Sequence, residues 1–236
     1  MTLLNASTIN IAVAANVSYA IEELKTTFSQ ANPEININVI LGSSGKLTAQ
    51  ISHGAPYGLF MSANMLYPQR LYEQRIALTE PRVYAKGTLA LFSTKPQDFS
   101  QGLKLLTSTN IQKIAIANPK TAPYGKAAFE ALQHVKLFKQ LKPKLIYGES
   151  ISQTLSYLIN AADIGLVATS SLYSATMSQY KKERHWVLVN TSLYAPLEQG
   201  VVLLQPAKDE RAYRLFYEFL FSQDAQKIFK KYGYLL

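Results

Sequence analysis

Residues 35–54 read ININVILGSSGKLTAQISHG and pass from a strand pattern into a helix pattern. Over the first eight residues, apolar side chains largely alternate with asparagine, as in a half-buried strand. A Gly42–Gly45 turn follows, and after it Leu47 and Ile51 are spaced as on one face of a helix. The segment therefore predicts a strand that turns directly into a helix.

The residues on either side extend this pattern. Alternating apolar residues predict a strand at 9–15 and a following helix that ends at Asn32 and Pro33, with Asn16 and Ser18 both suited to cap its N-terminus. A short apolar run predicts a third strand at 59–61. This β-α-β-α-β order predicts a parallel sheet with helices on both faces.

The rest of the chain repeats the order. We expect one strand through residues 82–93 and a second crossing near residues 186–193. Other strands are expected at 114–117, 144–147, 164–167 and 200–204, and helices at 124–135, 151–161 and 212–232. The fold predicted is α/β, with two Rossmann-like lobes joined by two crossing strands. Residues 1–82 plus 193–236 form lobe I, residues 83–192 form lobe II, and the ligand cleft is expected between them.

Composition excludes several classes of protein. The 236 residues contain no cysteine, which excludes a disulfide framework, a thiolate metal site and a thiol nucleophile. No apolar run approaches the roughly 18 to 20 residues of a membrane helix. The net charge of +9 comes from residues 81–190, which carry 14 basic and 5 acidic side chains. Because no interleaved aromatics accompany these charges, we expect a solvated basic face and no nucleic-acid partner.

Motifs for catalysis are lacking. Gly42–Lys46 invites comparison with a nucleotide-binding P-loop, but the first glycine of that motif would fall at Ile40 and its final hydroxyl at Leu47. The three histidines have no carboxylate or second histidine at metal-ligand spacing, and no G-x-S-x-G sequence occurs. We therefore expect a binding protein with no catalytic residues and no cofactor.

Four expected strand-to-helix turns share one chemistry. Each places small or hydroxyl residues at a helix N-terminus, and they are Ala14–Ser18, Gly42–Gly45, Thr121–Gly125 and Glu149–Ser152. In open α/β sheets, ligands bind beyond the carboxyl ends of the strands, where such turns gather. Helix N-termini offer N–H donors and a partial positive charge. The turns therefore predict an anion site built from neutral donors, two turns from each lobe.

More specific motifs run along nearly the whole chain. They are Val13-Ala14-Ala15-Asn16, Gly42-Ser43-Ser44-Gly45 with Leu47, Gly54-Ala55-Pro56, Phe60-Met61-Ser62-Ala63-Asn64, Ala117-Asn118-Pro119, Pro123-Tyr124-Gly125, Ile164-Gly165-Leu166-Val167 and Ile228-Phe229-Lys230-Lys231-Tyr232-Gly233-Tyr234. In these motifs the chain resembles the periplasmic molybdate-binding proteins of ABC importers, which have the type II substrate-binding fold. The resemblance implies a receptor that closes two lobes on molybdate or tungstate. The oxyanion is then the transported ligand, and the only metal is the one within it.

The resemblance also implies partners and a location. An inner-membrane ABC permease with its ATPase would receive the ligand, and the receptor would be a monomer. We expect a periplasmic protein whose signal peptide has been removed.

Ligand-binding residues follow from the resemblance position by position. The first side-chain ligand corresponds to Asn16 and the serine of the second turn to Ser44. Backbone N–H donors correspond to Tyr124 and Ile151, with Ala15 as an additional donor.

Three positions depart from the family pattern. Asn16 stands in place of serine, Gly58 in place of the usual aspartate, and Ala168 where some members have a ligating tyrosine. The missing tyrosine leaves one ligand oxygen without a donor. Either Ser43 or Ser170 compensates, or the affinity is lower.

Donor chemistry supports the ligand class independently. A deprotonated tetrahedral dianion has only acceptor oxygens, and a site without an acceptor cannot pair with the proton of hydrogen phosphate. Three alternatives remain: another tetrahedral oxyanion such as sulfate, an effector-sensing module of a transcriptional regulator, and an enzyme on the same scaffold. The regulator would carry a helix-turn-helix in front of the strand pattern that begins by Ile9, and the enzyme would need an acid-base pair.

Overall fold

The computed structural model describes residues 7–236 and arranges their strands in two five-stranded sheets. The chain divides into two compact units. Unit 1 holds the chain up to Lys86, Glu198–Lys231 and Leu235–Leu236, whereas unit 2 holds Gly87–Leu197 and Tyr232–Tyr234. Each unit has its own sheet covered by helices, so the predicted α/β class with two lobes is confirmed.

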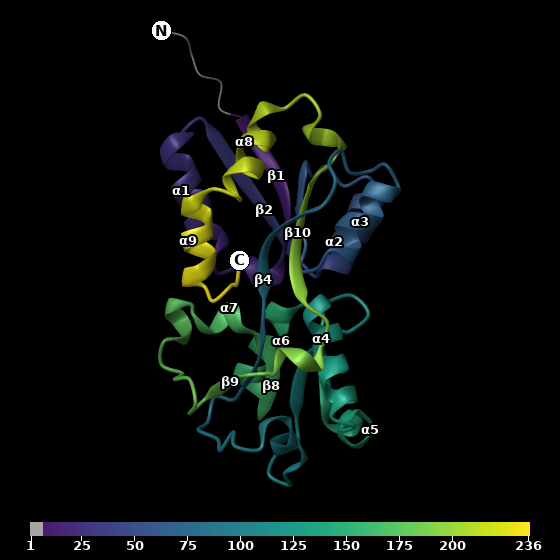
Figure 1. Ribbon diagram of the computed structural model, residues 1–236, viewed down its shortest axis with the longest axis vertical. Helices are drawn as coiled ribbons and strands as arrows, with labels where there is room; N and C mark the ends of the chain where they lie inside the picture. Colours follow the sequence, from purple (N-terminus) through teal and green to yellow (C-terminus); the bar gives the residue numbers. More distant parts are fainter. Residues whose placement is uncertain (1–6) are drawn as a thin grey trace. The chain divides into compact units, whose positions relative to one another are not determined.

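Unit 1 is built on a sheet of order β2-β1-β3-β10-β4 (Figure 1). Its strands are β1 (Ser7–Ala14), β2 (Ile35–Gly42), β3 (Leu59–Met61), β4 (Arg82–Gly87) and β10 (Leu197–Leu203). Its helices are α1 (Ile21–Ala31), α2 (Ser44–Ser52), α3 (Leu66–Glu73), α8 (Arg211–Phe219) and α9 (Gln223–Lys231), with 3-10 turns η1 (Ala15–Val17) and η6 (Gln205–Ala207). Because β1 runs parallel to β2 and β3, the carboxyl ends of these three strands lie at one edge.

Two layers of helices bury the two faces of this sheet. Figure 1 shows α1 and α9 on one side, and α2 and α3 on the other. Ala12, Phe60 and Val202 pack with Leu47 of α2 and Leu71 of α3 in one fully buried cluster. On the other side, the rings of Phe28 and Phe216 meet edge to face at 5.2 Å. Side chains alternate across a strand, which lets one short β1 supply both cores.

Unit 2 repeats the architecture with the order β7-β6-β8-β5-β9. Its strands are β5 (Leu89–Phe92), β6 (Ile114–Ala117), β7 (Leu145–Gly148), β8 (Ile164–Ala168) and β9 (Trp186–Leu188). Its helices are α4 (Pro123–His134), α5 (Phe138–Leu141), α6 (Ile151–Ala161) and α7 (Thr169–Leu172), with 3-10 turns η2 (Gly102–Thr107), η3 (Lys142–Lys144), η4 (Ala175–Met177) and η5 (Thr191–Leu193). β6 runs parallel to β7 and β8, so their carboxyl ends also share an edge.

A carboxylate holds the opposite edge of the unit 2 sheet. Asp163 lies just before β8, and its Oδ2 accepts hydrogen bonds from the backbone N–H groups of Gln112 (2.8 Å) and Lys113 (2.9 Å), just before β6. Partial burial of Asp163 raises its pKa. The hydrogen bonds from the N–H groups of Lys113 and Gln112 lower the pKa by more than burial raises it, so the pKa of Asp163 lies below its usual value.

The parallel pairing expected for the first three strands is confirmed, whereas each complete sheet is mixed. β10 runs antiparallel to β3, and β5 runs antiparallel to both β8 and β9. β5 is the strand by which the chain enters unit 2, and β10 is the strand by which it returns to unit 1. Neither strand follows a crossover helix from a neighbour in its own sheet.

The expected crossing strands also differ. The strand expected at 82–93 is two strands, β4 and β5, which belong to different sheets. β9 lies within the unit 2 sheet, and the return to unit 1 is made by β10, so the expected second crossing near 186–193 falls too early. Tyr194 keeps the segment after β9 in unit 2, because its hydroxyl accepts a hydrogen bond from the N–H of Leu89 at 3.0 Å.

The expected terminal helix is interrupted. α8 ends at Phe219 and α9 begins at Gln223. Ser222 lies between them, and its hydroxyl accepts from the N–H of Ala225 at 3.2 Å, which caps the new helix. Among residues 7–236, no helix is long and apolar enough to cross a membrane.

Candidate functional site

In unit 1, the predicted residues gather at the carboxyl edge of the sheet. Ala14 and Gly42 lie opposite each other at the ends of β1 and β2, and Met61 at the end of β3 lies opposite Val13. Asn16 follows β1, Ser43 and Ser44 follow β2, and Ser62 and Ala63 follow β3. The parallel strands therefore bring three short polar segments together.

Ser44 is the first residue of α2 and is only 1% exposed. Its Oγ accepts a hydrogen bond from the backbone N–H of Ala63 at 2.9 Å. That bond uses an acceptor lone pair, so the hydrogen of the hydroxyl points elsewhere. Among residues 7–236 no group accepts this hydrogen, and Ser44 can therefore donate to a bound anion.

Ser43 occupies the N-cap position of α2 and is 4% exposed. An N-cap hydroxyl normally accepts from an N–H in the first turn of its helix, but this side chain makes no such bond. Its buried Oγ has no hydrogen-bond partner within the described part of the chain. Ser43 thus adds a second buried hydroxyl to the N-terminus of α2.

Asn16 lies in η1 and is 2% exposed. The expectation that Asn16 or Ser18 caps the first helix is wrong, because α1 begins at Ile21 with Ala20 at its N-cap. The side chain instead donates from Nδ2 to Oε1 of Gln199 at 2.7 Å. Ala15 begins η1 and is 5% exposed. Both residues therefore lie at the predicted edge in a tight turn.

Gln199 is a buried residue of this edge that sequence reasoning missed. It lies on β10, is 0% exposed, and donates from Nε2 to the carbonyl oxygen of Ala63 at 3.3 Å. The available signal was an amide two residues before the apolar end of the strand, but its partner Asn16 lies 183 positions away.

In unit 2, Tyr124 and Ile151 lie in the first turns of α4 and α6. The first four N–H groups of a helix have no acceptor within it, and both residues occupy such positions. Ser150 caps α6 by accepting from the N–H of Gln153 at 3.2 Å. At Gly125, an added Cβ would lie 2.3 Å from the carbonyl oxygen of Ala117, so only glycine lets α4 start this close to β6.

Two further hydroxyl residues lie near this edge of unit 2. Ser170 is 4% exposed and is the second residue of α7, two positions after Ala168 at the end of β8. Thr121 lies just before α4, and its Oγ1 is buried with no hydrogen-bond partner within residues 7–236. Thr121 was not among the predicted residues, although it stands in one of the four turns.

Charged side chains contribute little to these turns. Glu149, at the edge of one turn, is exposed. Within the described residues, no group of three His, Cys, Asp or Glu side chains could hold a metal ion. The predicted site residues are therefore neutral hydroxyl, amide and backbone groups, which suit an anion.

Comparison with known proteins agrees with this chemistry. The model of the family described as bacterial extracellular solute-binding protein matches residues 9–235. The molybdate-binding protein ModA of Rhodobacter capsulatus is 33% identical over 95% of this chain and 86% of its own length. The chain belongs to the ModA family of bacterial extracellular solute-binding proteins.

Other ModA proteins extend the comparison. ModA of Azotobacter vinelandii is 31% identical over 97% of this chain and 90% of its own length. The solved structure of the Azotobacter vinelandii periplasmic molybdate-binding protein has a TM-score of 0.88 at 31% identity, covering 97% of this chain and 99% of that one. These relatives are binding proteins, and the likeness covers both units.

One departure from the ModA pattern has a packing explanation. A Cβ at Gly58 would lie 2.3 Å from the ring of Tyr213, whose hydroxyl accepts from the N–H of Asn10 at 2.9 Å. The tyrosine ring thus fills the space that a side chain at position 58 would need. Gly58 precedes β3, at the opposite end of the strand from Ala63, so this departure lies away from the predicted ligand residues.

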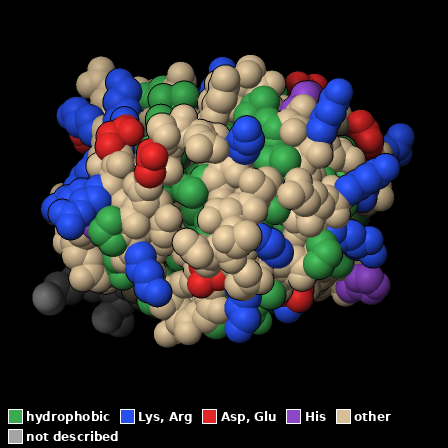
Figure 2. Space-filling model, turned by 90° about the horizontal axis from the view of Figure 1, so that it is seen from below, with side chains coloured by type: hydrophobic (Ala, Val, Ile, Leu, Met, Phe, Trp, Pro, Cys, Tyr) green, Lys and Arg blue, Asp and Glu red, His purple; other side chains and the backbone are tan. Residues whose placement is uncertain are grey.

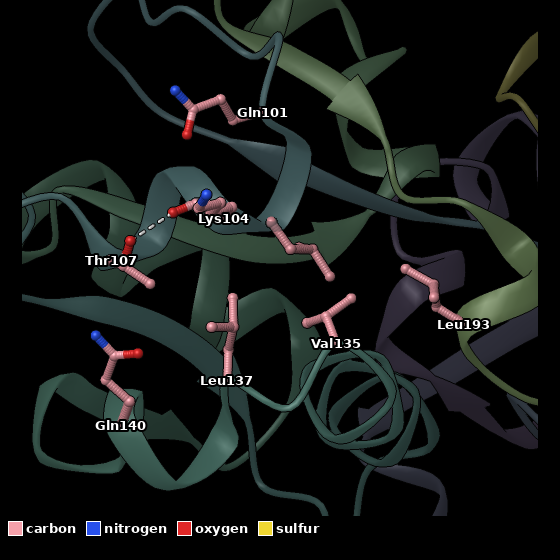
Figure 3. Close-up of a pocket in the computed structure, with 8 residues that line it drawn as sticks. Gln101, Lys104, Thr107, Val135, Leu137, Gln140 and Leu193 are labelled. Atoms are coloured by element: carbon pink, nitrogen blue, oxygen red, sulfur yellow. Dashed lines mark hydrogen bonds between the residues drawn. The ribbon is translucent and has the colours of Figure 1, made fainter.

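A separate cavity of about 600 Å³ lies within unit 2 (Figure 3). Apolar side chains of Val135, Leu137 and Leu193 line it together with Gln101 and Lys104. The eight described residues that line it include none of the predicted ligand residues.

Figure 2 shows many Lys and Arg side chains spread over one face of the molecule, with fewer Asp and Glu side chains among them. The basic charge is thus dispersed over that surface.

Proposed function

We propose that this chain is the substrate-binding receptor of an ABC importer and captures molybdate or tungstate. Membership of the ModA family supports the ligand class. The observation that carries the proposal is the pair of buried hydroxyls at the N-terminus of α2, since Ser43 Oγ has no partner among the described residues and Ser44 Oγ already accepts from Ala63. Both hydroxyls then have a hydrogen to donate, as an acceptor-only dianion requires.

Three helix N-termini support the same ligand. α2, α4 and α6 each begin at a proposed ligand segment, with Ser44, Tyr124 and Ile151 in their first turns. Each end carries a partial positive charge and N–H groups without helical acceptors. In this proposal unit 1 supplies the side-chain donors Asn16, Ser43 and Ser44, with Ala15 as an additional donor. Unit 2 supplies backbone donors, and either Ser43 or Ser170 replaces the tyrosine donor that is absent at Ala168.

Selectivity follows from the lack of a buried carboxylate acceptor at the turns. Hydrogen phosphate carries a proton that needs an acceptor, and Glu149, the one carboxylate at the turns, is exposed. We therefore propose that phosphate binds poorly because its proton finds no buried carboxylate acceptor. Sulfate is distinguished from molybdate and tungstate by its size.

The biological setting is part of the proposal. The receptor would work in the periplasm as a monomer, after removal of its signal peptide, and deliver the oxyanion to a membrane permease driven by an ATPase. Closure of the two units on the ligand would produce the form that the permease recognises. The oxyanion is the cargo, so no resident cofactor and no catalytic step are involved.

Calorimetric titration of the purified chain with molybdate, tungstate, sulfate and phosphate at equal ionic strength tests this function. Saturable binding of molybdate and tungstate is expected, with weaker sulfate binding and none of phosphate. Ser52→Ala is the matched control for variants of Ser43 and Ser44, because Ser52 is an exposed serine at the other end of α2. A chain that binds none of the four anions, or binds phosphate best, would refute the proposal.

A further inference from the structure

A continuous chain of hydrogen bonds runs through the buried edge of unit 1. Asn16 Nδ2 donates to Gln199 Oε1 at 2.7 Å, and Gln199 Nε2 donates to the carbonyl oxygen of Ala63 at 3.3 Å. The N–H of the same Ala63 donates to Ser44 Oγ at 2.9 Å. All four residues are at most 2% exposed. One backbone residue therefore links two side chains that we propose as ligands.

The backbone groups of Ala63 fix the direction of every bond in this chain. A carbonyl oxygen can only accept, so Gln199 must present its amide nitrogen to it. The amide oxygen of Gln199 then faces Asn16, which must present its own nitrogen. On the other side of Ala63 the N–H can only donate, so the oxygen of Ser44 must accept.

We infer that Gln199 is a positioning residue that fixes the side-chain amide of Asn16 in the orientation that presents a hydrogen to the oxyanion. The inference rests on the proposed function. An asparagine amide has two nearly isosteric orientations, and the flipped one exchanges its nitrogen and oxygen. The flipped orientation would set the oxygen of Asn16 against the oxygen of Gln199. Gln199 thereby excludes it before the ligand arrives.

This role accounts for a polar residue at a position that would otherwise favour an apolar one. Gln199 precedes the fully buried Val201 and Val202 on β10. Burying an amide costs free energy unless its groups are hydrogen-bonded, and Gln199 achieves this through Asn16 and Ala63. A serine at position 16 would need no such partner, because a hydroxyl turns freely to donate.

A double-mutant cycle tests the inference. Gln199→Met keeps the side-chain length and removes both hydrogen bonds, and Asn16→Ser removes the amide that Gln199 is inferred to orient. We expect Gln199→Met to weaken molybdate affinity about tenfold or more in the wild-type background, since a hydrogen bond to a charged group is lost. In the Asn16→Ser background the same change should alter affinity by less than about twofold. Gln205→Met is the matched control, because Gln205 follows β10 and is exposed.

Each outcome bears on the inference. Unchanged affinity of Gln199→Met, or an equal loss in both backgrounds, would overturn it, because a merely structural effect does not depend on residue 16. If the wild-type chain binds no oxyanion, the proposed function fails first and the inference falls with it. If Gln199→Met does not fold, nitrogen-15 NMR of the wild-type chain decides. The side-chain N–H of Asn16 that donates to Gln199 should be protected from exchange before molybdate is added, whereas two unprotected hydrogens in the ligand-free protein would overturn the inference.

Discussion

Removing the hydroxyls of Ser43 and Ser44 one at a time should have different effects on stability and similar effects on binding. Ser44→Ala deletes the acceptor of the Ala63 N–H, which is buried at a residue 2% exposed. A buried N–H without a partner costs about 1 to 3 kcal/mol. We therefore expect the free energy of unfolding of the ligand-free protein to fall by that amount, and the melting temperature by about 2 to 4 °C for each kcal/mol.

Ser43→Ala should leave this stability unchanged. Replacing an N-cap serine by alanine normally costs about 0.5 to 2 kcal/mol. Here the hydroxyl makes no capping bond and has no partner in the described structure, so its removal breaks nothing in the ligand-free protein. Both variants should lose molybdate affinity by about 10-fold to 150-fold, the value of one hydrogen bond to a charged ligand.

Urea unfolding of the ligand-free variants and calorimetric titration with molybdate measure the two effects separately. Ser52→Ala should behave as wild type in both assays. The reasoning is refuted if Ser43→Ala lowers the free energy of unfolding by a full kcal/mol while binding molybdate normally. That result would make Ser43 an ordinary helix cap.

Two further predictions concern sites away from the proposed ligand. Gly58→Ala should lower the free energy of unfolding by about 1 to 3 kcal/mol, because the new Cβ would lie 2.3 Å from the Tyr213 ring. The molybdate affinity of the folded variant should stay unchanged. Urea unfolding measures the stability and calorimetry the affinity, and a normal stability would contradict the packing account. Asp163→Asn should reduce the loss of stability in acid. The pKa of Asp163 is lower in the folded than in the unfolded state, so the carboxylate stabilises the fold fully above the unfolded pKa, near 3.8. This stabilisation is lost as the pH falls through the folded pKa. Unfolding midpoints measured across that pH range should fall less steeply for the variant, and parallel curves would contradict the assignment.

Local pattern was sufficient for the elements that surround the proposed site. The alternation before Gly42 and the helical spacing of Leu47 and Ile51 predicted β2 and α2 near their observed bounds, and the helix expected at 151–161 is α6. The spacing of apolar residues that predicts these elements involves only residues close together in sequence, so it can be recognised without knowing the fold.

Features that depend on distant partners could not be predicted. The direction of β5 and β10 depends on which strand each one joins, and neither partner is adjacent in the chain. The pairing of Asn16 with Gln199 spans 183 positions. Gly58 could be explained only once the ring of Tyr213 was placed beside it. The sequence thus indicates which segments carry the polar turns, whereas hydrogen-bond direction within them requires the fold.

The division of the chain into units has a consequence for the order in which they can be completed during synthesis. Nearly all of unit 2 is one continuous piece, Gly87–Leu197, whereas unit 1 needs residues from both ends of the chain. Until β10 emerges, β3 is an edge strand with unsatisfied backbone groups on one side. Such an edge can pair with another chain. Residues 7–86 are therefore the part of the nascent protein most exposed to aggregation, until β10, the last strand in chain order, has been translated.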